Sequence, residues 1–507
     1  MNRRKISDII SMSKISKWRK GDISFIEAGT GDGKTYFVIN TLYEYAKINN
    51  KRILLLVNRS SSYIQFINEI IAKRKTDVIK VETYQKLEHM KLCKKKNYDL
   101  FNYDYIVCDE FHYFLNDSAF NDRTDVAFTQ VMENENAVKI FMSATGKNMK
   151  RYIIENIETY VDPSTIEIRE YSLPVTYDFI NKVSFFYKEE NLDDLIKKFI
   201  DEGSKAIFFM QTLDSAFNLY ERHSEHCLFN CSSQNKKDYN YNKKKKYYDS
   251  VDQNKIKKML EEERFEEQIL ITTPCMDSGV NIKDPDVKNI VVFIYDLDTL
   301  IQCIGRKRLF DCNDKINLYV MHINNNRLGG VYIDTTHKKN QIEYFKKHGA
   351  SDYSDKYPRS DGVNRGIYDT NISSKSSVGK KVNPLIEYKY NLTLKEIESI
   401  KKNKKLGYKG FEYGKYLLDS LEITNYKLFE NEKKEPIIKD YLNKMKEKLL
   451  DKQEQEKLAK VFDVKDSYRR PYKTIGKLNK YLLENNFEYK IRTKIIKNKT
   501  YWKIIKR

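Results

Sequence analysis

The stretch Phe25-Ile26-Glu27-Ala28-Gly29-Thr30-Gly31-Asp32-Gly33-Lys34-Thr35 decides the fold expected for this chain. An apolar strand runs into a glycine-rich turn, which ends in Gly-Lys-Thr at the start of an expected helix from Tyr36 to Tyr45. Glycines let the backbone bend tightly and bring its N–H groups to an anion, and the new helix adds its positive dipole end. The pattern predicts a phosphate-binding loop in which Lys34 reaches the β- and γ-phosphates and Thr35 ligates Mg²⁺.

This loop departs from the usual pattern at its first position, where Ala28 stands in place of glycine. A chance glycine-rich turn is the alternative, but Gly-Lys-Thr falls at the strand-to-helix junction that the motif requires. We therefore expect the nucleotide to contact the whole loop, namely Ala28, Gly29, Thr30, Gly31, Asp32, Gly33, Lys34 and Thr35.

A pair of acids provides the second signal. The apolar run Tyr105–Cys108 ends in Asp109-Glu110. Asp109 is expected to hold Mg²⁺, and Glu110 to orient the attacking water or accept its proton. Adjacent acids more often form a solvated turn, but their position after an apolar strand and downstream of a phosphate loop favours the catalytic interpretation.

The third signal is the string Gln302-Cys303-Ile304-Gly305-Arg306-Lys307-Arg308. Phosphoryl transfer builds charge on the γ-phosphate, and an arginine from a facing surface stabilises that charge. Arginine has the planar geometry and permanent charge that this role needs. A basic surface patch is the alternative, but the presence of the phosphate loop and the acid pair in the same chain favours a catalytic role for Arg306.

Taken in order, these segments resemble the motifs of superfamily 2 helicases and translocases of the DExH-box type, within the DEAD/DEAH box helicase family. The resemblance covers residues 20 to about 325. Ala28–Thr35 resembles motif I, Asp109-Glu110-Phe111-His112 motif II, Ser143-Ala144-Thr145 motif III, Asp277-Ser278-Gly279 with the three residues after it motif V, and Gln302–Arg308 motif VI.

The resemblance implies that ATP and Mg²⁺ bind between two domains. Asp277 and Gly279 would then join the nucleotide contacts, and Gln302 would belong to the catalytic group and couple the nucleotide to the nucleic-acid path. Motif VI usually carries a second arginine three residues after the first, but Leu309 occupies that position. Either the local backbone presents Arg308 instead, or Arg306 works alone.

Apolar strands alternate with helical segments over most of the chain. This alternation predicts an α/β fold with parallel sheets flanked by helices, and ligands then bind at the carboxyl ends of the strands. We expect two tandem RecA-like domains, followed by a mostly helical C-terminal region with a small α+β end module. The expected parts are domain 1 at 1–172, domain 2 at 173–325, an irregular linker or insertion at 326–384, and a basic auxiliary domain, a candidate for nucleic-acid binding, at 385–507.

The formal net charge of +20 over 507 residues favours a polyanionic partner, chiefly nucleic acid. The chain is also rich in Lys, Asn, Ile and Tyr, so a compositional bias is the alternative explanation. No apolar run approaches the ~20 residues of a membrane span, and the seven cysteines show no disulfide framework. We expect a cytoplasmic protein without a membrane partner.

The end of the chain has its own pattern. A helix is expected at Tyr472–Glu484, then strands at 488–496 and 500–505 with a turn between them. Basic residues alternate with apolar ones along the first of these strands, which suits nucleic acid. A winged-helix-like module and an ordinary α+β cap both remain open.

The first interpretation of the whole chain is an ATP-dependent nucleic-acid helicase, on DNA in preference to RNA. One alternative is a duplex translocase or motor subunit of a restriction- or defence-type assembly, with protein partner subunits. Another is a nucleic-acid binding scaffold with a degenerate ATPase. The intact Lys34, Asp109, Glu110 and Arg306 argue against the scaffold.

Overall fold

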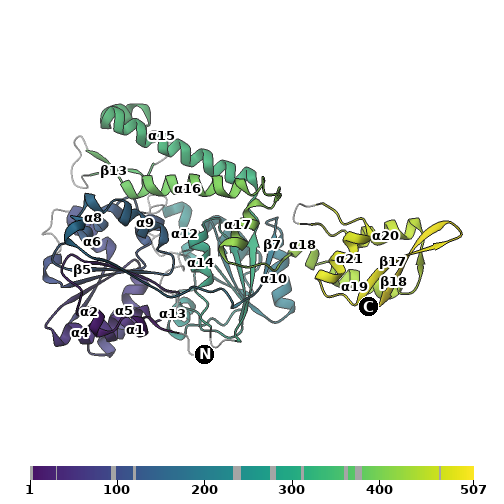
Figure 1. Ribbon diagram of the computed structural model, residues 1–507, viewed down its shortest axis with the longest axis horizontal. Helices are drawn as coiled ribbons and strands as arrows, with labels where there is room; N and C mark the ends of the chain where they lie inside the picture. Colours follow the sequence, from purple (N-terminus) through teal and green to yellow (C-terminus); the bar gives the residue numbers. More distant parts are fainter. Residues whose placement is uncertain are drawn as a thin grey trace.

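The computed structural model describes residues 4–29, 31–92, 99–117, 121–231, 241–274, 281–309, 313–358, 364–370, 379–466 and 470–506. Two sheets, each flanked by helices, lie side by side. A pair of long helices, α15 and α16, crosses above both, and a small module projects beyond the second sheet (Figure 1).

The first sheet has six strands in the order β3-β2-β4-β5-β1-β6, and all of its pairs are parallel. Its strands are nearly continuous apolar runs, as expected for a sheet covered on both faces, and two hydrophobic clusters fill those faces. The strands are β1 Ile23–Glu27, β2 Ile53–Val57, β3 Ile79–Thr83, β4 Tyr105–Asp109, β5 Val138–Ser143 and β6 Ile168–Ser172.

Helices connect these strands. A continuous helical run from Lys34 to Ile48 follows the phosphate loop, with a π-helical stretch at Phe37–Leu42. The helices of this domain are α1 Ile6–Ile9, α2 Met12–Ile15, α3 Lys34–Tyr36, α4 Tyr43–Ile48, α5 Ser60–Ala72, α6 Tyr84–Leu92, α7 Tyr113–Asn116, α8 Thr124–Met132 and α9 Lys147–Glu155.

The second sheet has seven parallel strands in the order β15-β7-β12-β11-β8-β10-β9. Its edge strand β15 (Tyr426–Leu428) comes from the region expected to be auxiliary and pairs with β7. The other strands are β7 Ile180–Phe186, β8 Lys205–Met210, β9 Cys227–Asn230, β10 Ile269–Thr272, β11 Val287–Phe293 and β12 Ile316–Met321, and the helices are α10 Asn191–Asp201, α11 Leu213–Arg222, α12 Tyr241–Asp249, α13 Gln253–Glu262 and α14 Leu297–Ile304.

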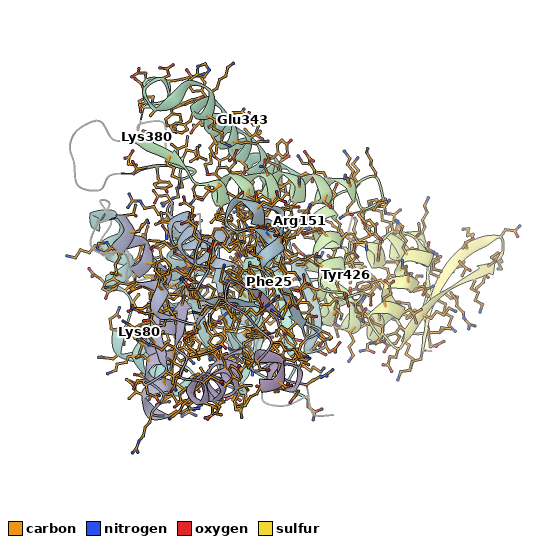
Figure 2. The ribbon with its side chains drawn as sticks, turned by 60° about the vertical axis from the view of Figure 1, so that its left-hand side comes forward. Phe25, Lys80, Arg151, Glu343, Lys380 and Tyr426 are labelled. Carbon is orange, nitrogen blue, oxygen red and sulfur yellow. The ribbon has the colours of Figure 1, made fainter. Side chains whose placement is uncertain are left out.

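The expectation of an irregular segment at 326–384 is wrong for its first half. Helix α15 spans Asn325–Lys356, with a break at Gly349, where φ is +83°. It packs along another helix, α16 (Pro384–Lys402), and its first turn also contacts the core of the second domain through the buried Leu328. Glu343 on α15 and Lys380 on the short hairpin of β13 (Ile367–Asp369) and β14 (Lys380–Val382) lie at the end of the molecule away from the sheets (Figure 2).

Helix α16 belongs to both domains. Its buried cap Asn383 accepts the N–H groups of Leu385 and Ile386, and Pro384 occupies the first turn. Leu385 packs in the core of the first domain, whereas Ile397 packs in the core of the second. Helix α17 (Glu412–Ser420), β15 and α18 (Phe429–Glu432) then complete the second domain.

The last part of the chain folds around its own hydrophobic cluster. The helical chain from 435 to 462 is interrupted, because Glu447 adopts a positive φ of 64° and Leu449–Leu450 pairs as a strand with β18. The module contains α19 Glu435–Met445, β16 Leu449–Leu450, α20 Lys452–Phe462, α21 Ile475–Glu484, β17 Tyr489–Ile496 and β18 Lys499–Lys506.

These observations confirm the expected fold class of tandem RecA-like domains followed by a mostly helical region with a small end module. Among the described residues, no helix is both long enough and apolar enough to span a bilayer.

Asp22, a buried carboxylate, ties the start of β1 to the edge strand β6. It accepts the N–H groups of Arg19 and Glu167, both at 2.8 Å, and the guanidinium of Arg169 at 2.6 Å. Burial opposes its ionisation, but these donors outweigh burial and lower the pKa of Asp22.

We predict that Asp22→Asn lowers the free energy of unfolding by about 1–3 kcal/mol at neutral pH, because an amide cannot satisfy all three donors. Since the folded-state pKa is lowered, the carboxylate's contribution is present above the unfolded-state value of about 3.9 and is lost as the pH falls through the folded-state value. Urea unfolding of the wild type and Asp22→Asn at neutral and acidic pH measures the difference in their free energies of unfolding, which should become smaller in acid. The same difference at both pH values would contradict a stabilising role of the Asp22 carboxylate.

Candidate active site

A cavity of about 350 Å³ lies between the two sheets and is lined by both domains. The three predicted motifs meet here. The phosphate loop and the acid pair follow the ends of β1 and β4, and Arg306 and Arg308 follow the end of α14. The first domain supplies Gly29, Gly31, Gly33, Lys34, Thr35, Tyr36, Ser62, Gln65, Phe66, Glu69, Asp109 and Glu110, and the second supplies Asn281, Arg306 and Arg308.

The phosphate loop has the backbone geometry that its glycines allow. Gly31 and Gly33 have φ values of +87° and +88°, in the left-handed region that side chains disfavour. Lys34 is buried, and its Nζ donates to the carbonyls of Ala28 at 2.8 Å and Gly29 at 3.3 Å. The ammonium is thus held inside the loop at the place where a bound phosphate would replace the carbonyls as its partner.

The N-terminal segment supports the same loop. Lys5 Nζ donates to the Gly31 carbonyl at 2.8 Å, and the Ile6 N–H donates to the Asp32 carbonyl at 3.0 Å. The sequence gives no sign of these two contacts, because each joins groups that lie far apart in the chain. Two other loop residues predicted to contact the nucleotide, Ala28 and Asp32, are buried and do not line the cavity, and Thr30 lies outside the described residues.

The acid pair stands at the end of β4 with an unusual backbone. Glu110 has a positive φ of 50°, which costs energy for a side chain with a Cβ and is typical of functional sites. Burial and the charge of Glu110 raise the pKa of Asp109 to about 7. Burial also opposes ionisation of Glu110, but a hydrogen bond with His112 and the charge of Lys34 outweigh burial and lower its pKa.

His112 connects this acid pair to the second domain. Gln302 on α14 donates from Nε2 to His112 Nε2 at 2.6 Å and to Thr145 Oγ1 at 2.8 Å. Because the amide nitrogen only donates, His112 Nε2 accepts and the ring proton lies on Nδ1. That Nδ1 is 2.8 Å from Ser143 Oγ and 3.3 Å from Glu110 Oε2.

The structure explains the unexpected arginine spacing. Lys307 forms a parallel β-bridge with Ile282, whose N–H and carbonyl pair with Arg306 and Arg308. Successive side chains of extended backbone point to opposite sides. Arg306 and Arg308 therefore both line the cavity, whereas Lys307 turns away and pairs with Asp314 at 2.6 Å.

Arg308 is also poised for an anion. Its Nε donates to Asn281 at 2.7 Å, but its buried Nη1 has no hydrogen-bond partner among the described residues. Burial and the nearby Arg306 lower the pKa of Arg308 to about 10, so it remains charged at neutral pH. A buried guanidinium with an unused donor, aimed into a cavity, fits a phosphate oxygen.

The remaining predicted site residues differ in their placement. Gln302 does not line the cavity and instead joins the domains behind it. Asp277 and Gly279 lie outside the described residues. Sequence reasoning missed the cavity side chains of α5, Ser62, Gln65, Phe66 and Glu69, because they follow no phosphate or acid motif.

Helix α16 braces the two halves of the site. Lys389 Nζ contacts Asp296 Oδ2 at 3.0 Å and Asn116 Oδ1 at 3.3 Å. Asn116 ends α7, which directly follows the acid pair, and Asp296 caps α14, the helix that carries Gln302. Burial would lower the pKa of Lys389, but the charges of Asp296 and Asp298 raise it.

Comparisons with known proteins place these features in context. Residues 4–148 match the family described as "Type III restriction enzyme, res subunit". The comparison with curated proteins gave no match. The matched stretch contains the phosphate loop, the acid pair and Ser143–Thr145, and it supports the superfamily 2 helicase assignment that the ordered motifs predicted.

Solved structures of helicases are among those similar to this chain. Mss116p lacking its NTE and C-tail, bound to ssRNA and AMP-PNP, aligns with a TM-score of 0.44 and 17% identity over 61% of this chain and 68% of that chain. A point variant of S. cerevisiae Dbp5, bound to RNA and ADP BeF3, aligns with a TM-score of 0.43 and 16% identity over 59% of this chain and 78% of that chain. At these TM-scores the likenesses carry no further argument.

We predict that the Lys389–Asp296 contact contributes a coupling free energy of about 1–3 kcal/mol to the stability of the assembled domains. The variants Lys389→Met, Asp296→Asn and their combination form a double-mutant cycle, and the Asn variant keeps an oxygen to cap α14. Urea unfolding of the full-length proteins should show that the double variant is more stable than the sum of the single losses predicts. Strictly additive losses contradict the brace.

Proposed function

We propose that this protein is an ATP-driven motor that moves along nucleic acid, with DNA as its track, and unwinds it. The observation that carries the proposal is the single cavity in which a phosphate loop and an acid pair from one domain face two arginines from the other. Neither domain holds a complete set, so hydrolysis would depend on the closeness of the two domains.

Each cavity residue has a role that its chemistry suits. Lys34 and the N–H groups of the loop would bind the β- and γ-phosphates. Arg306 and Arg308 would stabilise the charge that develops on the γ-phosphate, and the unused Nη1 of Arg308 supports its part in this. ATP is proposed as the nucleotide because a triphosphate matches this distribution of cations along the cavity.

The residues present also fit Mg²⁺. Asp109 is a buried carboxylate beside a second acid, and both features raise its pKa, so a nearby cation would favour its charged form. Thr35 lines the same cavity and can add a hydroxyl oxygen. The ion, when bound, would supply charge neutralisation for the phosphates.

Glu110 is suited to act on the attacking water. Its lowered pKa keeps it ionised at neutral pH, so that it can orient the water or take its proton. His112 Nδ1 lies 2.8 Å from Ser143 Oγ and 3.3 Å from this carboxylate, and Ser143 Oγ donates to the carboxylate at 3.2 Å, while the other ring nitrogen faces Gln302. A movement of α14 would therefore reach the catalytic acid through one histidine, which makes His112 and Gln302 positioning residues.

DNA is proposed as the track because the string Asp109-Glu110-Phe111-His112 departs from the one that gives DEAD-box RNA helicases their name. The net charge of +20 supports a polyanionic track of either kind. A second candidate function is translocation along duplex without unwinding, as the motor subunit of a larger assembly. The match to the res-subunit family favours this candidate and implies protein partner subunits.

We predict that Arg306→Ala and Arg308→Ala each lower the kcat of ATP hydrolysis by about 100-fold or more, because each removes positive charge from the transition state. Phosphate release by the purified full-length protein with Mg²⁺ and nucleic acid measures this effect. Lys307→Met is the matched control, because Lys307 faces Asp314 and not the cavity. This substitution should lower thermal stability but leave the turnover of the folded protein near that of the wild type. Wild-type turnover in Arg308→Ala would mean that Arg306 works alone.

A further inference from the structure

The C-terminal module, residues 435–506, has a helix–strand–helix–helix–hairpin order. Its three strands pair in the order β16-β18-β17, so that the short β16 joins the hairpin of β17 and β18. The hairpin turns at Lys497 and Asn498, whose φ values are both positive, at 47° and 59°. The order of the elements and of the three strands matches a winged-helix arrangement, one of the two interpretations that the sequence left open. The connection between α20 and α21 is longer than the short turn of a helix-turn-helix pair.

The net positive charge of the module lies in its second half. Residues 435–466 contain eight Lys and Arg and eight Asp and Glu. Residues 470–506, which form α21 and the hairpin, contain eleven Lys and Arg and only two Asp and Glu. A compositional bias toward lysine would affect both halves alike, so this asymmetry indicates a function of the second half.

The basic side chains stand on the surface. On and just before α21, Lys473, Lys477 and Lys480 are exposed at spacings of four and three, while Leu478 and Leu482 are buried in the module core. Lys477 and Lys480 are three residues apart within α21 and therefore share one face of the helix, whereas Lys473 precedes the N-cap, Thr474. The helix presents these two lysines to solvent on the side away from its core contacts, and Lys473 stands just before its first turn.

The hairpin continues this basic surface. Lys490, Arg492 and Lys494 of β17 are exposed, whereas Ile491 is buried. Asn479 on α21 donates to the Ile491 carbonyl at 2.8 Å and accepts its N–H at 2.7 Å. These bonds fix α21 along the outer edge of β17, so the two sets of cations lie on adjoining elements.

Gly476 adds an independent observation in the first turn of α21. It is exposed, and a Cβ built on it meets no atom within 4 Å. The module's own packing thus has no use for a glycine, although glycine is a poor helix former. A missing side chain at an exposed position of a basic helix lets another molecule's backbone approach closely.

The body of the protein leaves this surface open. The module is attached through α18, where Asn431 exchanges hydrogen bonds with the Lys465 backbone at 2.7 and 3.1 Å and Lys434 contacts the Asp463 carbonyl at 2.6 Å. Those contacts use the neutral half. From the basic half, the buried Tyr481 of α21 adds one contact, because its hydroxyl donates to the Asn431 carbonyl at 3.4 Å. In both views the hairpin extends away from the two large domains (Figures 1 and 2).

We propose that α21 and the β17–β18 hairpin bind duplex DNA, with α21 in the major groove and the hairpin against the phosphate backbone. The major groove of B-DNA, about 12 Å wide, admits an α-helix, whereas the deep groove of A-form RNA is too narrow. Single strands are held by exposed aromatic rings, but Tyr481 and Tyr489 are buried and Trp502 packs against the module core. The proposal names a second contact with the track of the proposed motor and rests on the proposed function in that respect, but binding itself needs no ATP.

The test measures binding of a short fluorescein-labelled DNA duplex to the full-length protein without nucleotide, by anisotropy over a range of salt concentrations. The variant combines Lys473→Glu, Lys477→Glu and Lys480→Glu. Its matched control combines Lys452→Glu, Lys457→Glu and Lys460→Glu, which reverse as many exposed charges on the neighbouring helix α20. The first variant should lose about 100-fold in affinity, and its log–log salt slope should flatten by about 0.9 for each lost phosphate contact, whereas the control stays near wild type.

Equal losses in both triple variants, or no loss in either, would overturn the proposal, as would an effect of the first variant on duplex RNA as large as that on DNA. Gly476→Leu carries no charge and favours the helix, so it keeps the test decisive if the first triple variant misfolds. Gly476→Leu should weaken duplex binding while thermal stability stays the same or rises, and unchanged binding overturns the proposal. ATP hydrolysis is measured separately: α21-dependent DNA binding by a protein without turnover would reject the proposed motor and leave this surface standing.

Discussion

The hydrogen bond from Gln302 to His112 is the interaction on which the site depends. It joins α14 of the second domain to the residue two positions after the catalytic acid of the first. With that distance set at 2.6 Å, Arg306 and Arg308, which follow Gln302 closely, lie across the cavity from the phosphate loop. The same contact places the ring proton of His112 toward Glu110, so domain position and the state of the acid are linked in one chain of hydrogen bonds.

Part of the C-terminal region is built into the two large domains, and the rest is an addition to them. Strand β15 extends the second sheet, and α16 packs in both domain cores while Lys389 contacts groups from each domain. A segment that touches both domains constrains how they separate. Beyond α18 the chain forms an independent core, and the β17–β18 hairpin extends away from the body.

Much of the site followed from the sequence because the motifs and the parallel fold constrain each other. The strands before the phosphate loop and the acid pair were predicted almost to the residue, and both groups line the cavity. Strand carboxyl ends meet at one edge, so local patterns were enough to predict a shared site.

Other features needed the three-dimensional structure. The arginine spacing made sense only once Lys307 was seen paired with Ile282 as extended backbone. Strand β6, at the edge of the first sheet, and strand β7, between β15 and β12, carry polar residues and were not predicted. Helix α15 has few buried apolar residues, and Lys389 reaches partners from far along the chain. Such contacts depend on tertiary neighbours, which single-sequence patterns do not contain.

In the proposed function, the two domains together form one site for ATP hydrolysis, and nucleic acid stimulates hydrolysis at that site. The direct measurement is steady-state ATP hydrolysis by the full-length protein, alone and with single-stranded DNA, duplex DNA or RNA, with Lys34→Ala and Glu110→Gln as controls. The account predicts turnover that DNA stimulates and that both substitutions abolish. Turnover that survives Lys34→Ala, or a wild-type protein that hydrolyses no ATP with any polymer, would contradict it.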